Sequence, residues 1–376
     1  MVESLYIHIP FCLKKCVYCD FISIPFDKAL SKRYVDALIK EMSLAGGRAN
    51  RFRLKTVFIG GGTPTALRSG EIERFLAALG ENFRLRPDCE FTAEANPATL
   101  DGEKLDVLIE GGVNRISIGA QSFEKDELKL LGRAHRPEDI TDAVRLARRA
   151  GFENIGLDLI YGIPGQTMEA WRRNLKRALE LGPTHISAYE LTVEPRTGLM
   201  DLVKSGALSM PPDDEVLLMC RTAREVLEEA GLVRYEVSNY ALPGSECRHN
   251  LNYWRRGEYL GLGAAAHSFS GVPPRRWRNT DSVPDYICRL ESNALPVAGT
   301  ETLSAEDEKR ELVLLGLRTK DGVSISKAKR MGFQIEPAAG ELIGEGLLRI
   351  EADRLFATGR GLELLNSVIF RLLEGI

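Results

Sequence analysis

The sequence predicts an α/β fold, because apolar runs typical of strands alternate with amphipathic helical patterns through its first half. The expected strands cover residues 5–9, 56–59, 90–93, 115–118, 155–160 and 185–191, and the expected helices cover residues 30–44, 70–82, 102–110, 137–150 and 168–181. Strands that alternate with helices become parallel strands joined by right-handed crossovers. Six such units fit either a doubly wound sheet or a partial barrel. In both architectures, active sites gather at the carboxyl ends of the strands.

The rest of the chain is expected to differ from this alternating half. Residues 213–230 have the pattern of a helix, and residues 235–268 are irregular, polar and aromatic. Helical patterns then cover residues 305–317, 326–331, 338–345 and 362–373, and residues 346–350 and 354–357 are expected to form a hairpin. Helices with a two-stranded wing predict a small winged-helix-like domain. The expected domains are therefore residues 1–210, 211–299 and 300–376, and interspersed acidic residues in the last one favour docking over DNA binding.

Composition places the chain among soluble globular proteins. Its 376 residues suggest one large and one small domain, and 44% hydrophobic and 27% charged residues are enough for a full core. The net charge of −3 provides no basic field to recruit nucleic acid or an anionic membrane. The start resembles neither a signal nor a transit peptide, and no apolar run reaches spanning length, so we expect a cytoplasmic protein without stable membrane insertion. The scattered Cys89, Cys220, Cys247 and Cys288 are interpreted as reduced thiols.

Three cysteines near the N-terminus carry the clearest chemical signal. Cys12, Cys16 and Cys19 are spaced C-x3-C-x2-C and follow directly after the first expected strand. Four cysteines usually hold a four-iron cluster, so three without a nearby fourth predict a [4Fe–4S] cluster with one open iron, where chemistry can occur. A structural zinc site would need a fourth ligand, and His8 is the only other candidate ligand close by in the sequence. A disulfide framework would need a short secreted chain with an even number of cysteines, whereas this chain has seven.

Polar and glycine residues follow several expected strands at the point where each strand ends. The run Gly60-Gly61-Gly62-Thr63-Pro64-Thr65 comes after the second strand, and it is either a ligand-binding turn or a tight strand-to-helix connection. Glu94, Gln121 and Arg133 follow the third and fourth strands, and Asp158 lies within the fifth. A carboxylate in an apolar parallel strand is expensive to bury unless it binds something. Together these side chains predict a ring that faces a small polar ligand.

These motifs resemble those of the radical S-adenosylmethionine (SAM) superfamily. The cysteine triplet with Tyr18 before its last cysteine, together with segments 6–12, 60–65, 119–123 and 158–164, is similar to one branch of it. That branch contains oxygen-independent coproporphyrinogen III oxidase and the HemW haem chaperones, and the resemblance covers nearly the whole chain. It implies a partial (β/α)6 radical-SAM barrel with a C-terminal α+β extension and the small winged-helix-like domain.

The resemblance also implies a set of cofactors and site residues. In that family the amino and carboxylate groups of SAM chelate the open iron, and an electron from the cluster breaks the sulfonium bond to form a 5′-deoxyadenosyl radical. Cys12, Cys16 and Cys19 would then ligate the cluster. The implied SAM contacts are Tyr6, Tyr18, Gly61, Gly62, Thr63 and Glu94, with Gln121, Arg133 and Asp158 at nearby positions that include contacts to a second SAM in the oxidase. A carboxylate suits ribose hydroxyls or an ammonium group, and an arginine suits a carboxylate.

Features of the sequence favour the chaperone over the oxidase. The oxidase typically carries a fourth cysteine two residues past the triplet, where this chain has Phe21, and it has a long N-terminal extension, whereas the first expected strand here begins almost at Met1. Residues 249–254, HNLNYW, resemble the H-N-x-x-Y-W signature of the HemW chaperones, which the oxidase branch lacks. The chain is therefore expected to accept haem and to deliver it to apo-haemoproteins such as membrane respiratory enzymes. The alternative is oxidative decarboxylation of coproporphyrinogen III in haem biosynthesis.

His249 is the expected haem contact, because a neutral imidazole is a common axial ligand of haem iron, and Tyr253 and Trp254 can stack on a porphyrin face. The other interpretation is a structural histidine that hydrogen-bonds in a loop beside aromatic side chains. His267 and His8 are the next candidates. If His249 is the ligand, His249→Ala weakens haem binding while the cluster stays intact. The sequence leaves the client protein and the formation of a homodimer open.

Overall fold

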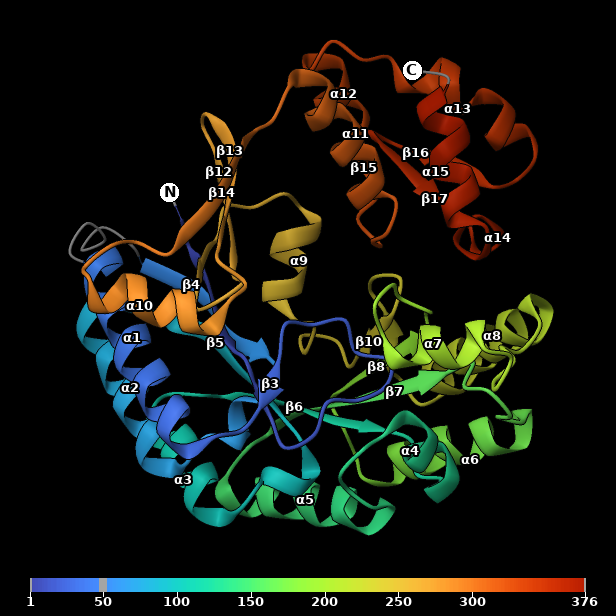
Figure 1. Cartoon of the computed structure of the whole chain (residues 1–376). Coiled ribbons are helices and arrows are strands. Elements are labelled where there is room, and N and C mark those ends of the chain that lie inside the picture. The colour runs from blue at the N-terminus through green and yellow to red at the C-terminus, as the bar shows by residue number, and fades with distance from the viewer. Residues whose placement is uncertain (1, 47–52, 375–376) are drawn as a thin grey trace.

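The computed structural model describes residues 2–46 and 53–374, and its largest feature is a nine-stranded sheet (Figure 1). Six of its strands run parallel and side by side in chain order: β1 (Ser4–Ile9), β4 (Arg53–Gly61), β5 (Arg84–Ala95), β6 (Arg115–Gln121), β7 (Asn154–Tyr161) and β8 (His185–Glu190). A doubly wound sheet reverses its strand order at a switch point, and these six strands do not. The sequential order is that of the predicted partial (β/α)6 barrel, and it leaves the carboxyl ends of the strands along one rim.

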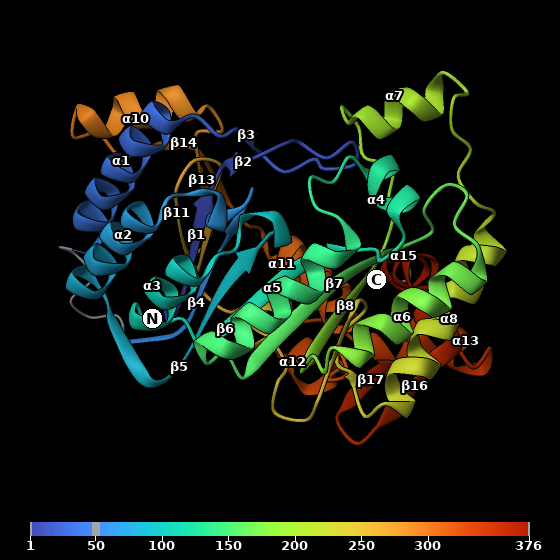
Figure 2. The ribbon, with the colours of Figure 1, turned by 90° about the horizontal axis from the view of Figure 1, so that it is seen from below.

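Five helices lie along the outside of the parallel strands, as Figures 1 and 2 show. They are α1 (Lys28–Gly46), α2 (Ser69–Asn82), α3 (Gly102–Glu110), α5 (Pro137–Ala150) and α6 (Met168–Glu180). In α5 the buried Ile140, Ala143, Val144 and Ala147 recur at three- and four-residue spacing, which gives the helix one apolar stripe toward the sheet. The sequence predicts all of these strands and helices to within three residues at their ends, except that β5 begins six residues before the expected strand. It does not predict the short α4 (Lys125–Leu131), which lies between β6 and α5.

The region that is expected to be irregular contains regular structure. β11 (Leu260–Leu262) pairs with β1 at one edge of the large sheet, and β10 (Asn239–Ala241) and β9 (Val233–Arg234) extend it beyond β8. A second, antiparallel sheet contains β12 (His267–Gly271), β13 (Pro274–Asn279) and β14 (Val297–Thr302). The helices here are α7 (Gly198–Lys204), the predicted α8 (Asp213–Glu229), α9 (Arg248–Trp254) and α10 (Val283–Glu291). The expectation for residues 235–268 is wrong, because strands of three to five residues are too short to display a two-residue period.

The C-terminal segment has a hydrophobic core of its own, where Val313, Leu355 and Leu372 meet. Its helices are α11 (Ala305–Gly316), α12 (Ile325–Arg330), α13 (Ile335–Gly344), α14 (Gly359–Glu363) and α15 (Leu365–Glu374). Its sheet contains β15 (Val323–Ser324) and the predicted hairpin of β16 (Leu348–Glu351) and β17 (Arg354–Ala357). Across residues 2–46 and 53–374, no helix combines the length and the apolarity that a membrane crossing needs.

Candidate functional site

The loop that carries the three cysteines is held at its base and at its tip. Its base is a pair of short parallel strands, β2 (Phe11–Cys12) and β3 (Ile24–Pro25). At its tip, the Val17 N–H donates to the Leu131 carbonyl (3.2 Å), and the Val17 carbonyl accepts from the Leu199 N–H (2.7 Å). The loop therefore reaches across from β2 and β3 to the ends of α4 and α7 (Figure 2).

A cavity of about 390 Å³, which we call the cysteine cavity, lies against this loop. It brings together most of the predicted site residues: Cys12, Cys16, Tyr18, Cys19, Gly61, Gly62, Thr63, Glu94, Gln121, Arg133 and Asp158. Four strands, β4 to β7, supply polar groups from or near their carboxyl ends. Tyr189 and Glu190 at the end of β8 also line the cavity, and they are missing from the predicted set although the same strand-end rule points to them. Tyr6 and His249 do not line it.

The three thiols are unpaired and partly buried at the cavity wall. The Thr63 hydroxyl donates to the Cys12 sulfur (3.6 Å), and Arg133 Nη1 donates to the Cys16 sulfur (3.4 Å). Burial raises the pKa of Cys12, and it raises the pKa of Cys19 to about 11. Among the described residues, no three His, Cys, Asp or Glu side chains converge as they would around a single metal ion. Thiolates that each bind a different iron of a cubane do not need to converge, so this arrangement fits a cluster.

Glu94 is held against the glycine run at the end of β4, where the Gly61 N–H donates to Glu94 Oε2 (3.2 Å). Gly61 has a φ of +108°, which favours glycine, and a Cβ at Gly62 would lie 2.8 Å from the Phe11 carbonyl oxygen. The glycines therefore let β4 end directly beside the cysteine loop. Burial, with a smaller contribution from the charge of Asp158, raises the pKa of Glu94 to about 8.

Three further polar side chains line the cavity. Asp158 accepts a hydrogen bond from the Ser117 hydroxyl (3.2 Å), and burial raises its pKa. Arg133 Nη2 donates to the Gly119 carbonyl (2.8 Å), while its buried Nε has no hydrogen-bond partner in the part of the chain that the structure describes. Gln121 has a left-handed φ of 65°, a strained conformation of the kind found at ligand sites. An unpaired arginine donor and two carboxyls suit a ligand with a carboxylate, an ammonium and hydroxyls, which are the polar groups of SAM.

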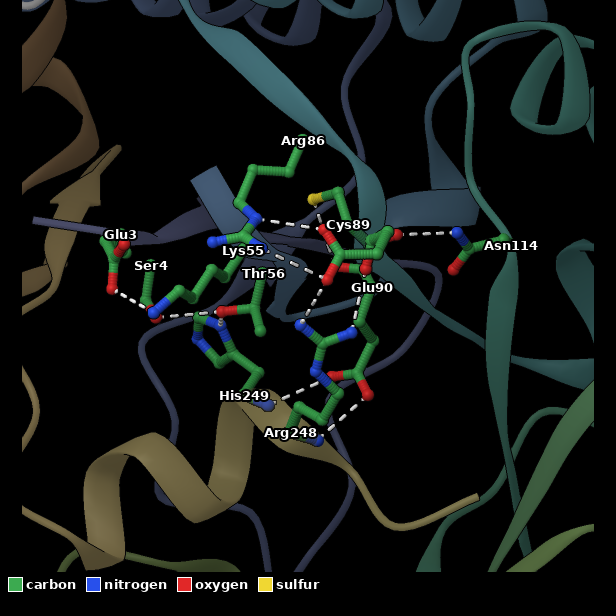
Figure 3. A network of polar contacts seen from close by, with 11 residues as sticks. Glu3, Ser4, Lys55, Thr56, Arg86, Cys89, Glu90, Asn114, Arg248 and His249 are labelled. Atoms are coloured by element: carbon green, nitrogen blue, oxygen red, sulfur yellow. Dashed lines mark hydrogen bonds and ion pairs between the residues drawn. The ribbon is translucent and has the colours of Figure 1, made fainter. Parts of the chain in front are cut away.

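His249 lies elsewhere, inside the protein (Figure 3). It is 0% exposed, and its Nδ1 and Nε2 pair with the hydroxyls of Thr56 and Tyr253, both at 2.8 Å. Burial lowers its pKa to about 3. In this conformation neither ring nitrogen is free for an iron atom, so a haem contact through His249 requires hydrogen bonds to break. This placement agrees with the structural interpretation of His249 rather than with that of a haem ligand.

A buried carboxylate that the sequence pattern does not single out fixes the backbone around His249. Glu90 accepts hydrogen bonds from the N–H groups of Arg248 and His249 at the start of α9, both at 2.9 Å (Figure 3). It also accepts one from the Cys247 thiol at 3.6 Å. Unpaired N–H groups at a helix start attract a carboxylate. The HNLNYW segment therefore forms a helix that is fastened to β5 through Glu90.

A second cavity, of about 580 Å³, adjoins the cysteine loop, and we call it the aromatic cavity. Asp20 and Phe21 of the loop line both cavities. The aromatic cavity also carries the rings of Tyr6, Tyr253, Tyr259 and Phe269 and the side chains of His8, Arg256, His267, Arg276 and Arg278. The Tyr6 hydroxyl pairs with His8 Nδ1 (3.0 Å), which sets Tyr6 apart from the other predicted SAM contacts. These residues come from separate segments, and the aromatic and arginine content of residues 253–278 is the signal that could have pointed to them.

Comparisons with known proteins identify related families. Residues 6–178 match the model of the Radical SAM superfamily, and residues 303–364 match the HemN C-terminal domain. The chain is 37% identical over 375 residues to the haem chaperone HemW of Bacillus subtilis, with 98% of each chain covered. It is 36% identical over 381 residues to the haem chaperone HemW of Escherichia coli, with 97% of each covered.

Among solved structures, coproporphyrinogen III oxidase (HemN) from Escherichia coli, a radical SAM enzyme, matches with a TM-score of 0.85. The match covers 99% of this chain and 90% of that one at 24% sequence identity. A likeness at that identity shows a common fold, which here includes the partial barrel and the C-terminal unit.

Proposed function

Because this chain belongs to the HemW family of haem chaperones within the radical SAM superfamily, we propose that it binds haem and delivers it to apo-haemoproteins. Respiratory enzymes are the proposed clients, and the cytoplasm is the proposed location. In this proposal residues 1–210 form the barrel, residues 211–299 connect it to the C-terminal unit, and residues 300–376 form a docking domain.

The cysteine cavity is the proposed site of a [4Fe–4S] cluster and SAM. Cys12, Cys16 and Cys19 would each bind one iron and leave the fourth iron open. Glu94 and Asp158 would accept hydrogen bonds from the ammonium and hydroxyl groups of SAM, and Arg133 would pair with its carboxylate. The remaining proposed contacts are Tyr18, Gly61, Gly62, Thr63 and Gln121. When bound, the cluster and SAM supply one-electron chemistry, and the chain positions them.

One observation carries this proposal: three free thiols and the polar ends of successive parallel strands line the same cavity. A structural zinc site is closed by four protein ligands and has no use for a ring of strand-end carboxyls. The ring is what a polar cofactor beside an open metal position requires. The similarity to haem chaperones over nearly the whole chain supports haem as the molecule that the protein carries.

Anaerobic reconstitution of the full chain tests the proposal. We expect about four irons and four sulfides per chain, together with SAM binding and haem binding in titrations of the same sample. The haem-loaded chain should then transfer haem to an apo-globin, which serves as a probe acceptor with its own absorption spectrum. A chain that binds zinc but no iron and sulfide contradicts the cluster, and a chain that binds no haem contradicts the chaperone function.

The second candidate function is the oxidase reaction, because the same cysteine cavity would serve a radical SAM decarboxylase. Phe21 argues against it, since its 61% exposed side chain occupies the position of the additional oxidase cysteine. An anaerobic assay with SAM, a reductant and coproporphyrinogen III separates the functions. Steady formation of protoporphyrinogen would favour the oxidase, whereas haem transfer without that product would favour the chaperone.

A further inference from the structure

The five histidines of the chain differ in whether their ring nitrogens are free. His8 pairs with the Tyr6 hydroxyl and the Ile22 carbonyl, and both nitrogens of His249 are paired as described. His135 and His185 each have one paired nitrogen and are only 3% and 2% exposed. His267 differs from these four, because it is exposed and neither of its nitrogens has a hydrogen-bond partner among the described residues.

His267 is the first residue of β12 and lines the aromatic cavity. In the antiparallel pair of β12 and β13, His267 lies opposite Arg278, and Phe269 lies opposite Arg276. Residues two apart in a strand and their cross-strand partners share one face, so all four belong to the cavity side of this sheet.

The walls of the aromatic cavity suit a flat aromatic molecule. The rings of Tyr253 and Tyr259 meet edge to face at 4.6 Å, and those of Tyr259 and Phe269 lie 6.4 Å apart. Such rings provide broad apolar surfaces with hydroxyl groups at their ends. The cavity volume of about 580 Å³ falls within the range of roughly 300–1,000 Å³ that small-molecule sites occupy.

The charged side chains that line this cavity are the acidic Asp20 and Asp281 and three arginines, of which one can receive an anion. Arg256 is paired with Glu308 and Glu311, and Arg276 is paired with Glu311. Arg278 is exposed, and no ion pair links it to a carboxylate of the described residues. It is therefore available for a carboxylate that a ligand brings, and it lies directly across from the free imidazole of His267.

We propose that the aromatic cavity is the haem site, where His267 is an axial ligand of the iron, Tyr259 and Phe269 pack against the macrocycle, and Arg278 pairs with a propionate. This inference rests on the proposed function, since it gives a place to the haem that a chaperone carries. Because Asp20 and Phe21 line both cavities, it puts haem one loop away from the cysteine cavity. One exposed ligand on a short strand also suits a molecule that must be released again.

Haem titrations of the anaerobically reconstituted full chain test the ligand. His267→Ala should weaken haem binding at least about tenfold, since even partners one shell away from a metal contribute that much. The variant should also lose the spectroscopic signature of a histidine ligand, and added imidazole should restore it. Metal-free protoporphyrin IX should bind wild type and His267→Ala equally, because the cavity keeps its shape. His249→Ala is the matched control, and its folded, iron-loaded fraction should keep the histidine signature.

A pair of arginine variants on one strand tests the proposed propionate contact. Arg278→Gln should weaken haem binding about three- to tenfold, as expected for a lost charged hydrogen bond at an exposed site. The haem dimethyl ester, which has no propionate charge, should bind wild type and Arg278→Gln equally. Arg275→Gln is the control, because Arg275 is exposed on the opposite face of β13 and does not line the cavity.

The outcomes separate this assignment from the proposed function. Wild-type affinity and spectrum in His267→Ala would overturn the assignment, as would loss of the histidine signature in folded His249→Ala. Either result would leave haem binding itself in place. A wild-type chain that binds no haem would overturn both the assignment and the proposed function.

Discussion

The cysteine cavity and the aromatic cavity share one loop but are built from different kinds of backbone. The cysteine cavity lies at the ends of β4 to β7, which the parallel sheet holds in register. The aromatic cavity touches that sheet only through Tyr6 and His8 of β1, and the rest of its lining comes from the cysteine loop, residues 253–281 and Leu315 of α11. Groups on a rigid sheet suit a resident cofactor that needs a fixed geometry. A lining that comes mostly from loops, a small sheet and a helix suits a ligand that enters and leaves.

The two cavities also differ in the charged side chains that line them. The cysteine cavity contains Glu94 and Asp158, and SAM carries a sulfonium and an ammonium group that such carboxyls attract. The aromatic cavity contains His267 and Arg278, which form no hydrogen bond or ion pair through their side chains with the described residues, and haem carries an iron and two carboxylates. One loop thus separates a cavity that holds two buried carboxyl groups from a cavity that holds an exposed arginine. A substitution in one cavity should therefore leave the other intact, and the first two of the three predictions that follow test this independence.

The largest effect is expected from removing the three thiols together. Cys12→Ala, Cys16→Ala and Cys19→Ala in one chain should abolish iron and sulfide binding, because the cavity offers no other sulfur ligands. Haem affinity should stay within about twofold of wild type, because none of the three cysteines lines the aromatic cavity. Iron and sulfide analysis and a haem titration of the same preparation measure both properties.

Cys288→Ala is the control for the thiol variant, since Cys288 is an exposed free thiol that lines neither cavity. It should keep the full iron and sulfide content. If haem binding disappeared together with the iron, the two cavities would not be independent, and the contrast drawn between them would fail.

The two cavities also differ in how far the sequence predicts them, and the residues of the cysteine cavity are the predictable ones. Cys12, Cys16 and Cys19 are adjacent in the chain, and Glu94, Gln121 and Asp158 each belong to a parallel strand whose carboxyl end must face the same rim. Local spacing and one rule of α/β architecture are enough to bring these residues together. The partial barrel and most of its helices follow from the same alternation.

The aromatic cavity has no comparable rule. His267 and Phe269 share a face with Arg278 only because β12 and β13 pair in a particular register, and strands this short carry little periodic signal. His249 illustrates the opposite difficulty. Its motif suggests a metal ligand, but Thr56 lies far away in the sequence, and only the fold shows that its hydroxyl pairs with a ring nitrogen of His249.

A smaller effect is expected from a residue that connects the aromatic cavity to the C-terminal unit. The Glu311 carboxylate pairs with Arg256 at 2.7 Å and with Arg276 at 2.5 Å, and its side chain is 14% exposed. Glu311→Ala leaves Arg256, whose side chain is 9% exposed, with the longer ion pair to Glu308 and the face of the Phe269 ring. We expect the free energy of unfolding to fall by about 2 kcal/mol, less than for a fully buried pair because Glu308 remains. Denaturant unfolding measures this loss.

The matched control for this variant is on the same helix. Glu306 pairs with Arg310, and both side chains are more than half exposed, so Glu306→Ala should change stability by less than about 0.5 kcal/mol. Iron content and SAM affinity should be unchanged in both variants, because α11 does not line the cysteine cavity. A loss of iron in Glu311→Ala as large as the loss of stability would show that the C-terminal unit also supports the cysteine cavity.

The smallest effect concerns the pH dependence of the chain without its cofactors. Burial and the charge of Asp158 raise the pKa of Glu94 to about 8, so the folded chain keeps this proton while the unfolded chain releases it near the ordinary value of 4.5. The contribution of the protonated carboxyl to stability is therefore complete below about pH 4.5 and is lost as the pH rises through about 8.

Glu94→Gln cannot lose a proton, so its melting temperature should fall less than that of wild type between pH 5 and about pH 8.5. The difference should correspond to about 1–2 kcal/mol, because solvent in the cavity reduces the full effect. A Glu94→Gln curve parallel to wild type would mean that Glu94 is already ionised in the empty cavity.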